Sequence, residues 1–243
     1  MGGGVDRVIG RIPVLEALKA RKRQPHRLYY LESAKDLGPI LNAAEDVPTQ
    51  ACTRPELDRL SRGENNQGVV LEAAPLPVTR LETWVKETLP GDAVVVLLDG
   101  VEDPHNFGAI VRTASAFGAI AAVFGKDRAA PLSPSAAKSA AGAMERLELV
   151  QATNLARGLG LMQKAGFWTV GLDGGAERIL WDADLRGRVV LVIGSEGKGM
   201  RRIVRDRCDF LLRIPIGGPI TSLNASAAAA VALAECARQR AVG

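Results

Sequence analysis

Cysteine and histidine are scarce in this sequence. The 243 residues include three cysteines and two histidines. The cysteines, Cys52, Cys208 and Cys236, are far apart and form no CxxC pair. Because zinc sites and disulfide frameworks require closely spaced or numerous cysteines, we expect neither, and we expect no metal ion. Isolated cysteines are typical of a reducing compartment, which predicts a cytoplasmic location.

Long apolar runs are also missing. No stretch reaches the roughly 20 apolar residues of a transmembrane helix, and the early residues lack the apolar core of a signal peptide. The nearest approach is the alanine-rich segment after Asn224, but alanine is only weakly hydrophobic and Glu235 interrupts the run. We therefore expect no membrane partner.

Aromatic residues make up only 4% of the chain, whereas hydrophobic residues as a whole make up 47%. The core must therefore be aliphatic, and the supply of Leu, Val, Ile and Ala is ample for a globular α/β protein. A length of 243 residues suits one large domain or two ordinary ones. The net charge of +4 permits a nucleic-acid partner without requiring one.

Short helices and strands alternate in the first part of the chain. Apolar residues at Ile12, Leu15 and Leu18, with basic residues off that face, predict an amphipathic helix over 8–23. Strands are expected at 27–31, 49–52 and 67–72, and helices at 36–45 and 55–60. These elements predict a compact α/β module of the size of a small domain.

The pattern changes after this module, where two prolines in residues 73–80 indicate a connection between domains. We expect a first domain over residues 1–77, a linker over 78–91 and a second domain over 92–243. The second domain begins with AVVVLL at 93–98, a continuous apolar run typical of a strand buried on both faces of a parallel sheet.

Strands and helices continue to alternate through the second domain. Further strands are expected at 121–124, 167–172, 189–193 and 210–216, and helices at 81–88, 108–117, 133–143, 154–165, 200–206 and 225–240. This order predicts a doubly wound α/β domain with its ligand at the carboxyl ends of the strands.

Two loops that follow apolar strands carry polar residues. The first holds Asn106, with Arg112 on the helix behind it; taken alone, Asn106 is a helix cap and Arg112 pairs with Glu102 or Asp103. The second, GSEGKGM at 194–200, holds Glu196. Neither loop carries a GxGxxG pattern, and the second has methionine where a Walker motif requires lysine, so we expect no dinucleotide or P-loop site.

A third loop places Thr221, Ser222 and Asn224 before a helix of small residues. In the simplest interpretation, Ser222 or Asn224 caps that helix. No Ser-His-Asp set, carboxylate pair or metal constellation stands out in the three loops. The residues alone therefore predict an α/β enzyme with a polar, glycine-lined pocket, and the reaction stays open.

The three loops, in order, resemble the three motifs of the SpoU (TrmH) family of RNA ribose 2′-O-methyltransferases, within the SPOUT superfamily. The motifs are LDGVEDPHNFGAIVRTASAFG at 98–118, LVIGSEGKGM at 191–200 and IPIGGPITSLNASAAAAVALAE at 214–235. Within this family the chain resembles the RlmB-like enzymes, which methylate a guanosine ribose in 23S ribosomal RNA. The segments that support this subgroup are GRIPVLEALK, NQGVV and GKDRAAPLSPSAAKSAAGAMERL, the last at 125–147.

The resemblance implies a knotted (trefoil) SPOUT methyltransferase domain with a parallel sheet, S-adenosylmethionine as methyl donor, and a homodimer. It also implies that the first domain is a small L30e-like α/β domain that holds the RNA substrate. The family's cofactor contacts correspond to Gly194, Ile214 and Leu223. Its active-site roles correspond to Asn106, Arg112, Glu196, Ser222 and Asn224. Arg112 would either activate the ribose hydroxyl or fix a phosphate beside it.

Two other functions stay open at this point: methylation of a transfer-RNA ribose by an enzyme of the same family, and RNA binding without catalysis. Basic residues of the first domain are candidates for phosphate contact, although a solvated helix face explains them nearly as well. They are Arg7, Arg11, Lys19, Arg21, Lys22, Arg23 and Arg27. The small side chains of the last helix would allow close packing, so Ala228 and Ala232 are expected at the dimer or knot surface.

Overall fold

The computed structural model describes residues 4–126, 132–219 and 222–241. Thr221 and part of the segment 125–147 thus lie outside the described residues. The chain divides into two compact units. Unit 1 comprises Met1–Pro77 together with Ala140–Arg146, and unit 2 comprises Val78–Ser139 together with Leu147–Gly243.

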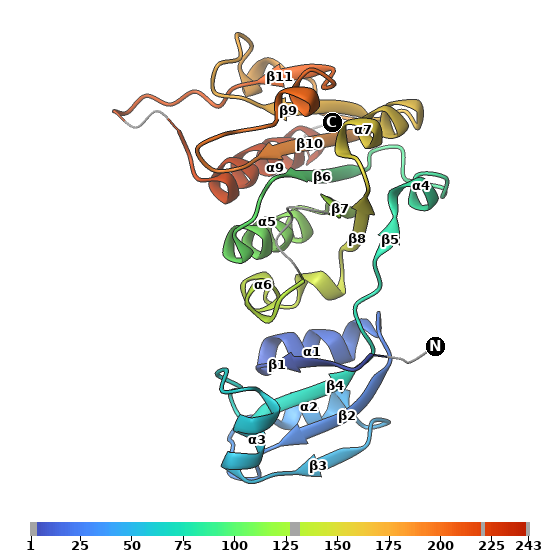
Figure 1. Ribbon diagram of the computed structural model, residues 1–243, viewed down its shortest axis with the longest axis vertical. Helices are drawn as coiled ribbons and strands as arrows, with labels where there is room; N and C mark the ends of the chain where they lie inside the picture. The colour runs from blue at the N-terminus through green and yellow to red at the C-terminus, as the bar shows by residue number, and fades with distance from the viewer. Residues whose placement is uncertain (1–3, 127–131, 220–221, 242–243) are drawn as a thin grey trace. The chain divides into compact units, whose positions relative to one another are not determined.

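Unit 1 is a small α/β module, drawn from blue to teal in Figure 1. Its elements are β1 (Asp6–Ile9), α1 (Arg11–Ala20), β2 (Pro25–Tyr30), α2 (Gly38–Ala43), β3 (Thr49–Ala51), α3 (Arg54–Leu60) and β4 (Val69–Ala73). In the described residues these strands form a four-stranded sheet in the order β1-β4-β2-β3. The β4 strand pairs antiparallel with β1 and β2, and β3 lies parallel to β2 at the edge.

The first helix begins later than the sequence pattern predicts. Residues 8 and 9 belong to β1, which pairs with β4, and Gly10 turns the chain with a φ of 96° before α1 starts. The buried face of α1 consists of Val14, Ala17 and Leu18, whereas Ile12 is 59% exposed. The prediction of an apolar face through Ile12 was wrong because the strand pairing fixes where the helix starts and so which side faces the sheet.

A short segment from later in the sequence completes unit 1. Ala143–Glu145 forms a 3-10 turn, and Gly142 comes so close to α1 that an added Cβ would lie 2.5 Å from the Cβ of Glu16. The carboxylate of Glu145 accepts hydrogen bonds from the Arg23 guanidinium, including two from Nε at 3.1 and 3.2 Å. Both side chains are buried, so this ion pair is shielded from water.

Unit 2 contains a parallel sheet. Its elements are β5 (Thr79–Arg80), α4 (Leu81–Trp84), β6 (Val94–Asp99), α5 (Pro104–Ala116), β7 (Ala121–Gly125), α6 (Pro134–Ala140, which runs into unit 1), β8 (Glu148–Ala152), α7 (Leu155–Lys164), β9 (Trp168–Leu172), β10 (Val189–Gly194), α8 (Arg202–Arg205), β11 (Phe210–Leu212) and α9 (Ala225–Ala241). Over the described residues the sheet has seven strands in the order β11-β9-β10-β6-β7-β8-β5. Every neighbouring pair in it is parallel.

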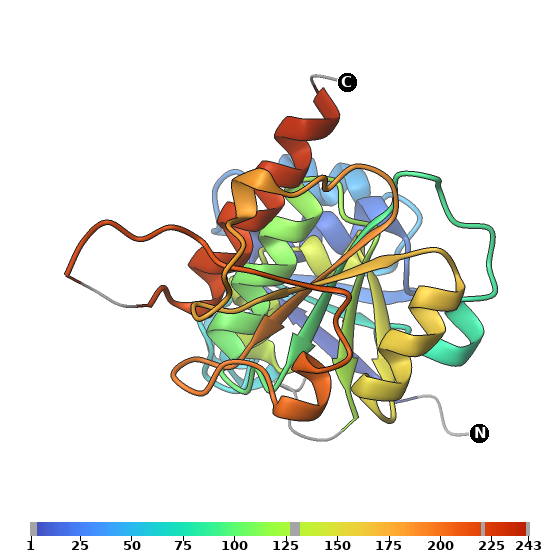
Figure 2. The ribbon, with the colours of Figure 1, turned by 90° about the horizontal axis from the view of Figure 1, so that it is seen from above.

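Helices cover both faces of this sheet, as Figure 2 shows from above. Helices α5 and α9 pack against each other on one face, and α4 and α7 contact each other on the opposite face. The central strands β6, β7 and β10 are almost wholly buried, which explains their continuous Val, Leu, Ile and Ala sequences. The predicted α/β class and parallel sheet are therefore confirmed.

Two segments of unit 2 differ from the expected elements. Residues 78–91, expected as a linker, include β5 and α4, and Leu81 and Trp84 are fully or almost fully buried in the core of the unit. The strand expected at 210–216 ends at Leu212, because Pro215 has no N–H and Gly217 follows closely. The predicted elements also lacked β8, whose sequence ELVQA has only two consecutive apolar residues, between Glu148 and Gln151.

The three cysteines are free thiols. Burial raises the pKa of Cys208 to about 12 and that of Cys236 to about 11, so both stay protonated at neutral pH and are poor nucleophiles. In the described parts of the chain, no helix combines the length and apolar character that crossing a membrane requires.

Replacing Arg23 with alanine should destabilise unit 1 by about 3–5 kcal/mol, because Glu145 would be left buried without its cationic partner. Amide hydrogen exchange along β4 would report this loss. Arg21→Ala is the matched control, since the Arg21–Asp46 pair is exposed to solvent and should contribute little to stability. Equal effects of the two substitutions would contradict a structural role for the buried pair.

Candidate active site

The polar loops of unit 2 meet at the carboxyl ends of the parallel strands. Asp99 and Gly194 end the neighbouring strands β6 and β10, and they are register partners in the ladder. The third loop runs from the end of β11 to the start of α9. The site therefore lies where the order of strands in the sequence predicts it.

The first loop is organised by Asp103 rather than by Asn106. The Asp103 carboxylate accepts hydrogen bonds from the backbone N–H groups of His105 and Asn106 at 3.2 and 3.3 Å. Pro104 occupies the first helical position, where its missing N–H costs nothing. The interpretation of Asn106 as the helix cap was wrong, because α5 begins at Pro104 and Asp103 is its cap. The amide side chain of Asn106 is therefore available for another contact.

The second loop is a tight hairpin after β10. Ser195 and Gly199 exchange backbone hydrogen bonds at 2.9 and 3.0 Å, so Glu196, Gly197 and Lys198 form its tip. Gly194 lies directly beneath this hairpin, and an added Cβ would come within 2.3 Å of the backbone of Gly199 and Met200. Only glycine permits this approach of two backbone segments.

The third loop ends in a cap. Asn224 Oδ1 accepts hydrogen bonds from the backbone N–H and the hydroxyl of Ser226 at 2.8 and 2.6 Å, and the Asn224 carbonyl accepts the first bond of α9. Asn224 is thus the helix cap, one of the two positions predicted. Because its oxygen is engaged in this way, the amide nitrogen Nδ2 points outward as a donor.

Glu196 joins the three loops. Its Oε2 accepts hydrogen bonds from Nδ2 of Asn106 at 3.3 Å and from Nδ2 of Asn224 at 3.4 Å. The two amides come from the first turn of α5 and the cap of α9, more than 100 residues apart in the sequence. Asn106 is 8% exposed, whereas Glu196 is exposed, so one side of the carboxylate stays accessible. The structure therefore brings three of the five predicted active-site residues into one cluster.

A cavity of about 330 Å³ adjoins this cluster, a volume within the range of small-molecule sites. Its walls include Leu172, Ile193, Leu212, Ile214, Ile216 and Leu223, together with the glycines of the hairpin. All three predicted cofactor contacts, Gly194, Ile214 and Leu223, line it, and so does Ser222. Apolar walls with a polar rim of this kind suit a nucleoside-like ligand.

Two residues of this cavity have backbone polar groups that no other described residue engages. Neither Ile214 nor Leu223 has a backbone hydrogen-bond partner among the described residues. Ile214 is half-buried, where backbone groups without a partner are unusual, and Leu223 is exposed. The N–H and C=O groups of both residues are thus available to a ligand. Asp173 also lines the cavity, and the Arg205 guanidinium beside it holds the pKa of that carboxyl below its usual range.

Arg112 does not join the cluster within this chain. It is exposed on α5, lines none of the described cavities and has no hydrogen-bond or ion-pair partner among the described residues. The alternative in which Arg112 pairs with Glu102 or Asp103 was therefore wrong. Its helix position lies six residues beyond Asn106, which turns it about 120° away around the axis.

Ala228 and Ala232 have different surroundings. Ala228 lines the 330 Å³ cavity, and Ala232 is fully buried within unit 2. The first turn of α9 thus contributes to a cavity wall, and the expectation that Ala228 and Ala232 lie at the dimer or knot surface stays a prediction. The sequence could not distinguish these positions, since both are alanines on one uniform small-residue helix.

The sequence did not point to Asp99 and Arg201, two further residues of this edge. Asp99, which is 1% exposed, accepts hydrogen bonds from the backbone N–H and Nε of Arg201 at 2.7 and 2.6 Å. The signal was an aspartate ending an otherwise wholly apolar strand.

A further contact joins His105 Nδ1 to Ser139 Oγ at 3.0 Å. Within the described residues, no group of three His, Cys, Asp or Glu side chains could hold a metal ion.

Comparison with known proteins gives consistent matches over both units. Residues 93–234, more than half of the chain, match the model of the SpoU rRNA Methylase family. Residues 7–79 match the family model described as RNA 2′-O ribose methyltransferase substrate binding.

Individual relatives match over most of their length. The 23S rRNA (guanosine-2′-O-)-methyltransferase RlmB of Pseudomonas putida is 45% identical over 205 residues, covering 83% of this chain and 82% of the relative. RlmB of Vibrio vulnificus is 40% identical over 227 residues, covering 90% and 92%. The crystal structure of the SpoU methyltransferase AviRb from Streptomyces viridochromogenes, in complex with the cofactor AdoMet, superposes with a TM-score of 0.82 at 25% identity, over 99% of this chain and 92% of that one.

Substituting Gly194 with alanine should abolish ligand binding in the 330 Å³ cavity, because the new Cβ would push the hairpin backbone away. Calorimetric titration with S-adenosylmethionine measures this effect. Gly174→Ala provides the control: Gly174 lines the same cavity, but a Cβ there meets nothing within 4 Å. If Gly194→Ala bound the ligand as tightly as Gly174→Ala, the role assigned to this close approach would be wrong.

Proposed function

This chain belongs to the SpoU rRNA methylase family, and we propose that it methylates the 2′-hydroxyl of a guanosine ribose in 23S ribosomal RNA, with S-adenosylmethionine as the donor. The observation that carries the proposal is the position of the Glu196 cluster. Three loops that are distant in sequence converge on one carboxylate at the rim of a nucleoside-sized cavity. Such a site can hold a donor and orient an acceptor beside it.

The donor site fits S-adenosylmethionine by its own chemistry. Apolar side chains from β9, β10 and β11 enclose the cavity, and the unpartnered backbone groups of Ile214 and Leu223 can hydrogen-bond an adenine edge. When bound, this donor supplies a methyl group on a positively charged sulfur. The ionised Asp173 on the cavity wall provides a nearby negative charge.

On the acceptor side, we assign orientation to the Glu196 cluster. Asn106 and Asn224 hold the carboxylate in one position, and Ser222 lies at the same rim. Much of the acceleration of a two-substrate transfer comes from such fixed placement of the reacting groups. We assign Arg112 to holding the phosphate beside the target ribose and stabilising the developing alkoxide, because a guanidinium stays protonated in proteins.

Further features of the family are included in the proposal. Residues 1–77 would form an L30e-like domain that binds the RNA substrate, as the substrate-binding match supports, and residues 92–243 the catalytic domain. The catalytic domain would carry the trefoil knot and form a homodimer, and the enzyme would act in the cytoplasm. Arg112 is exposed and has no side-chain partner among the described residues, which supports a site completed by the second subunit or by the RNA.

A transfer-RNA ribose is the second candidate substrate. RlmB of Vibrio vulnificus, which covers 90% of this chain, is named as a ribosomal RNA enzyme, and this favours the first candidate. The putative TrmH family methyltransferase YacO of Bacillus subtilis, which covers 97% of this chain, is named for both transfer and ribosomal RNA. Mapping ribose methylation on ribosomal and transfer RNA from a strain lacking the protein would decide between them. One methyl group missing from a 23S guanosine is expected; a methyl group missing only from transfer RNA would overturn the proposal.

Replacing Arg112 with alanine should lower the rate of methyl transfer by about 100-fold or more, the usual cost of losing one group that stabilises developing charge. Binding of S-adenosylmethionine should be unchanged, because Arg112 does not line its cavity. Transfer of a labelled methyl group to 23S transcript measures the rate, and calorimetry measures donor binding. Arg80→Ala, another exposed arginine of unit 2 without a described side-chain partner, is the control. Near-normal turnover in Arg112→Ala would refute the assignment.

A further inference from the structure

The basic residues expected to contact RNA in unit 1 are mostly engaged within that unit. Arg23 is buried against Glu145, Arg7 bonds Leu60 and Glu72, and Arg11 bonds the carbonyls of residues 35 and 67. Arg21 and Arg27 bond Asp46 and Gln50. Arg23 in particular was wrongly expected at the surface. These residues therefore leave few side chains of unit 1 available to bind phosphate.

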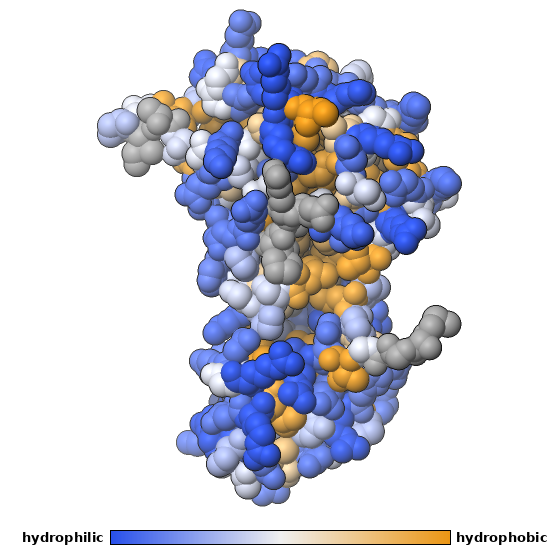
Figure 3. Space-filling model, viewed as in Figure 1, coloured by the Kyte–Doolittle hydropathy of each residue, from blue (hydrophilic) through white to orange (hydrophobic). Residues whose placement is uncertain are grey.

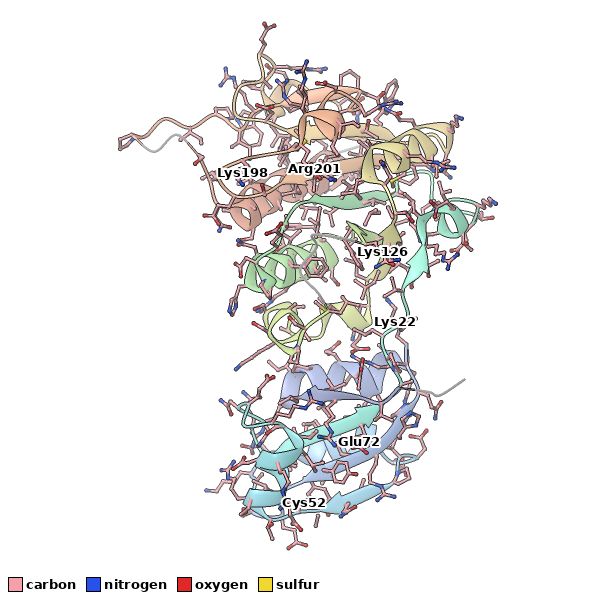
Figure 4. The ribbon with its side chains drawn as sticks, viewed as in Figure 1. Lys22, Cys52, Glu72, Lys126, Lys198 and Arg201 are labelled. Carbon is pink, nitrogen blue, oxygen red and sulfur yellow. The ribbon has the colours of Figure 1, made fainter. Side chains whose placement is uncertain are left out.

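Unit 2 carries further cations along the edge that contains the candidate active site. Lys198 is at the tip of the hairpin, Arg201 precedes α8, and Lys126 directly follows β7. Figure 4 labels the three side chains, which follow one another across unit 2 in that order. All three are exposed. Hydrophilic and hydrophobic side chains both lie on the face of unit 2 that Figure 3 shows.

Two small cavities connect these side chains. The first, of about 150 Å³, shares Ser195, Lys198 and Gly199 with the donor cavity, so the hairpin is a wall common to both. The second, of about 210 Å³, shares Gly125, Leu155 and Arg201 with the first. A continuous series of hollows therefore extends from the donor site toward the ends of β7 and β8.

The second small cavity, here called the β7–β8 cavity, is lined by hydrogen-bond donors. Its polar side chains are Lys126, Thr153, Asn154 and Arg201, and none of its described lining residues is a carboxylate. Asn154 Oδ1 accepts from the N–H of Arg157 at 3.0 Å, which leaves the Nδ2 of Asn154 to donate. Lys126, the amide donor of Asn154 and the Arg201 guanidinium, which is paired through Nε with Asp99, together favour a phosphate-like anion in this hollow.

Asp99 fixes the orientation of the Arg201 side chain. Its Nε and backbone N–H both bond the buried Asp99, so the guanidinium has a fixed direction while its two Nη atoms have no partner among the described residues. Lys126 has no hydrogen-bond or ion-pair partner for its side chain there either. Its positive charge is thus not neutralised by a neighbouring side chain in the described structure.

We propose that the β7–β8 cavity binds a phosphodiester of the RNA strand that carries the target ribose, with Lys126 and Arg201 as the ligands. This inference rests on the proposed methylation of RNA. The cavity lies two strand spacings from β10, about 10 Å, which corresponds to roughly three nucleotides of a stacked strand. The contact fixes the strand on the far side of the hairpin from the donor and so determines which nucleotide reaches the acceptor position.

The test is Lys126→Glu, with Lys164→Glu as the matched control. Lys164 is exposed at the opposite end of α7 and lines none of the described cavities, so both variants change the net charge equally. Binding of a labelled, unmodified 23S rRNA transcript is measured over a range of salt concentrations. Lys126→Glu should weaken binding about tenfold more than Lys164→Glu, as expected for a lost charge-assisted contact.

The salt dependence gives a second readout. Loss of one phosphate contact should reduce the slope of log K against log salt by about 0.7–0.9 in Lys126→Glu. Lys126→Arg should restore both affinity and slope, and S-adenosylmethionine binding should be unchanged in every variant. In turnover, the KM for RNA should rise while kcat at saturating RNA stays near that of the wild type.

The outcomes separate this inference from the proposed function. If Lys126→Glu and Lys164→Glu bind RNA with the same affinity and slope, the phosphate site is refuted even when methyl transfer is observed. If the wild-type chain shows the Lys126-dependent slope but transfers no methyl group to ribosomal or transfer RNA, the phosphate site stands and the proposed function fails.

Discussion

The active edge of this protein depends on one close approach of backbone to backbone, where Gly194 lies against Gly199 and Met200. This contact ends β10 and folds the next five residues into a hairpin that stands between the donor cavity and the hollow beside it. The hairpin in turn presents Glu196 to amides from α5 and α9. Since no side chain fits between the two backbones, the geometry of both neighbouring sites is set by the absence of a single Cβ.

Some of this arrangement could be predicted from the sequence. Uninterrupted apolar strands such as β6 and β10 can only be buried on both faces, and that requirement fixes a parallel sheet and places the polar loops at one edge. The cofactor contacts at Gly194, Ile214 and Leu223 came from the resemblance to a family and lie together in one cavity. The recognition proposed for them is through backbone groups, so their side chains alone give no sign of it.

Other features depend on contacts that periodicity does not encode. Asn106 looked like a cap because an asparagine preceded an apolar helix, but Asp103 and Pro104 three and two positions earlier start the helix instead. Arg23 looked like one more exposed cation in a basic stretch, and its partner is a glutamate more than 100 residues later. The same limit applies to Asp99 and Arg201, since their pairing depends on the ladder between β6 and β10.

The seven residues Ala140–Arg146 make unit 1 discontinuous in the sequence. The chain passes between the units after residues 77, 139 and 146, so three covalent connections join them. A fragment cut at the apparent boundary would keep every strand of the small sheet but lose the glutamate that neutralises Arg23 and the turn that packs on α1. Unit 1 is therefore a folded body assembled from two separate pieces of chain, and transfer of this module into another protein requires moving both pieces together.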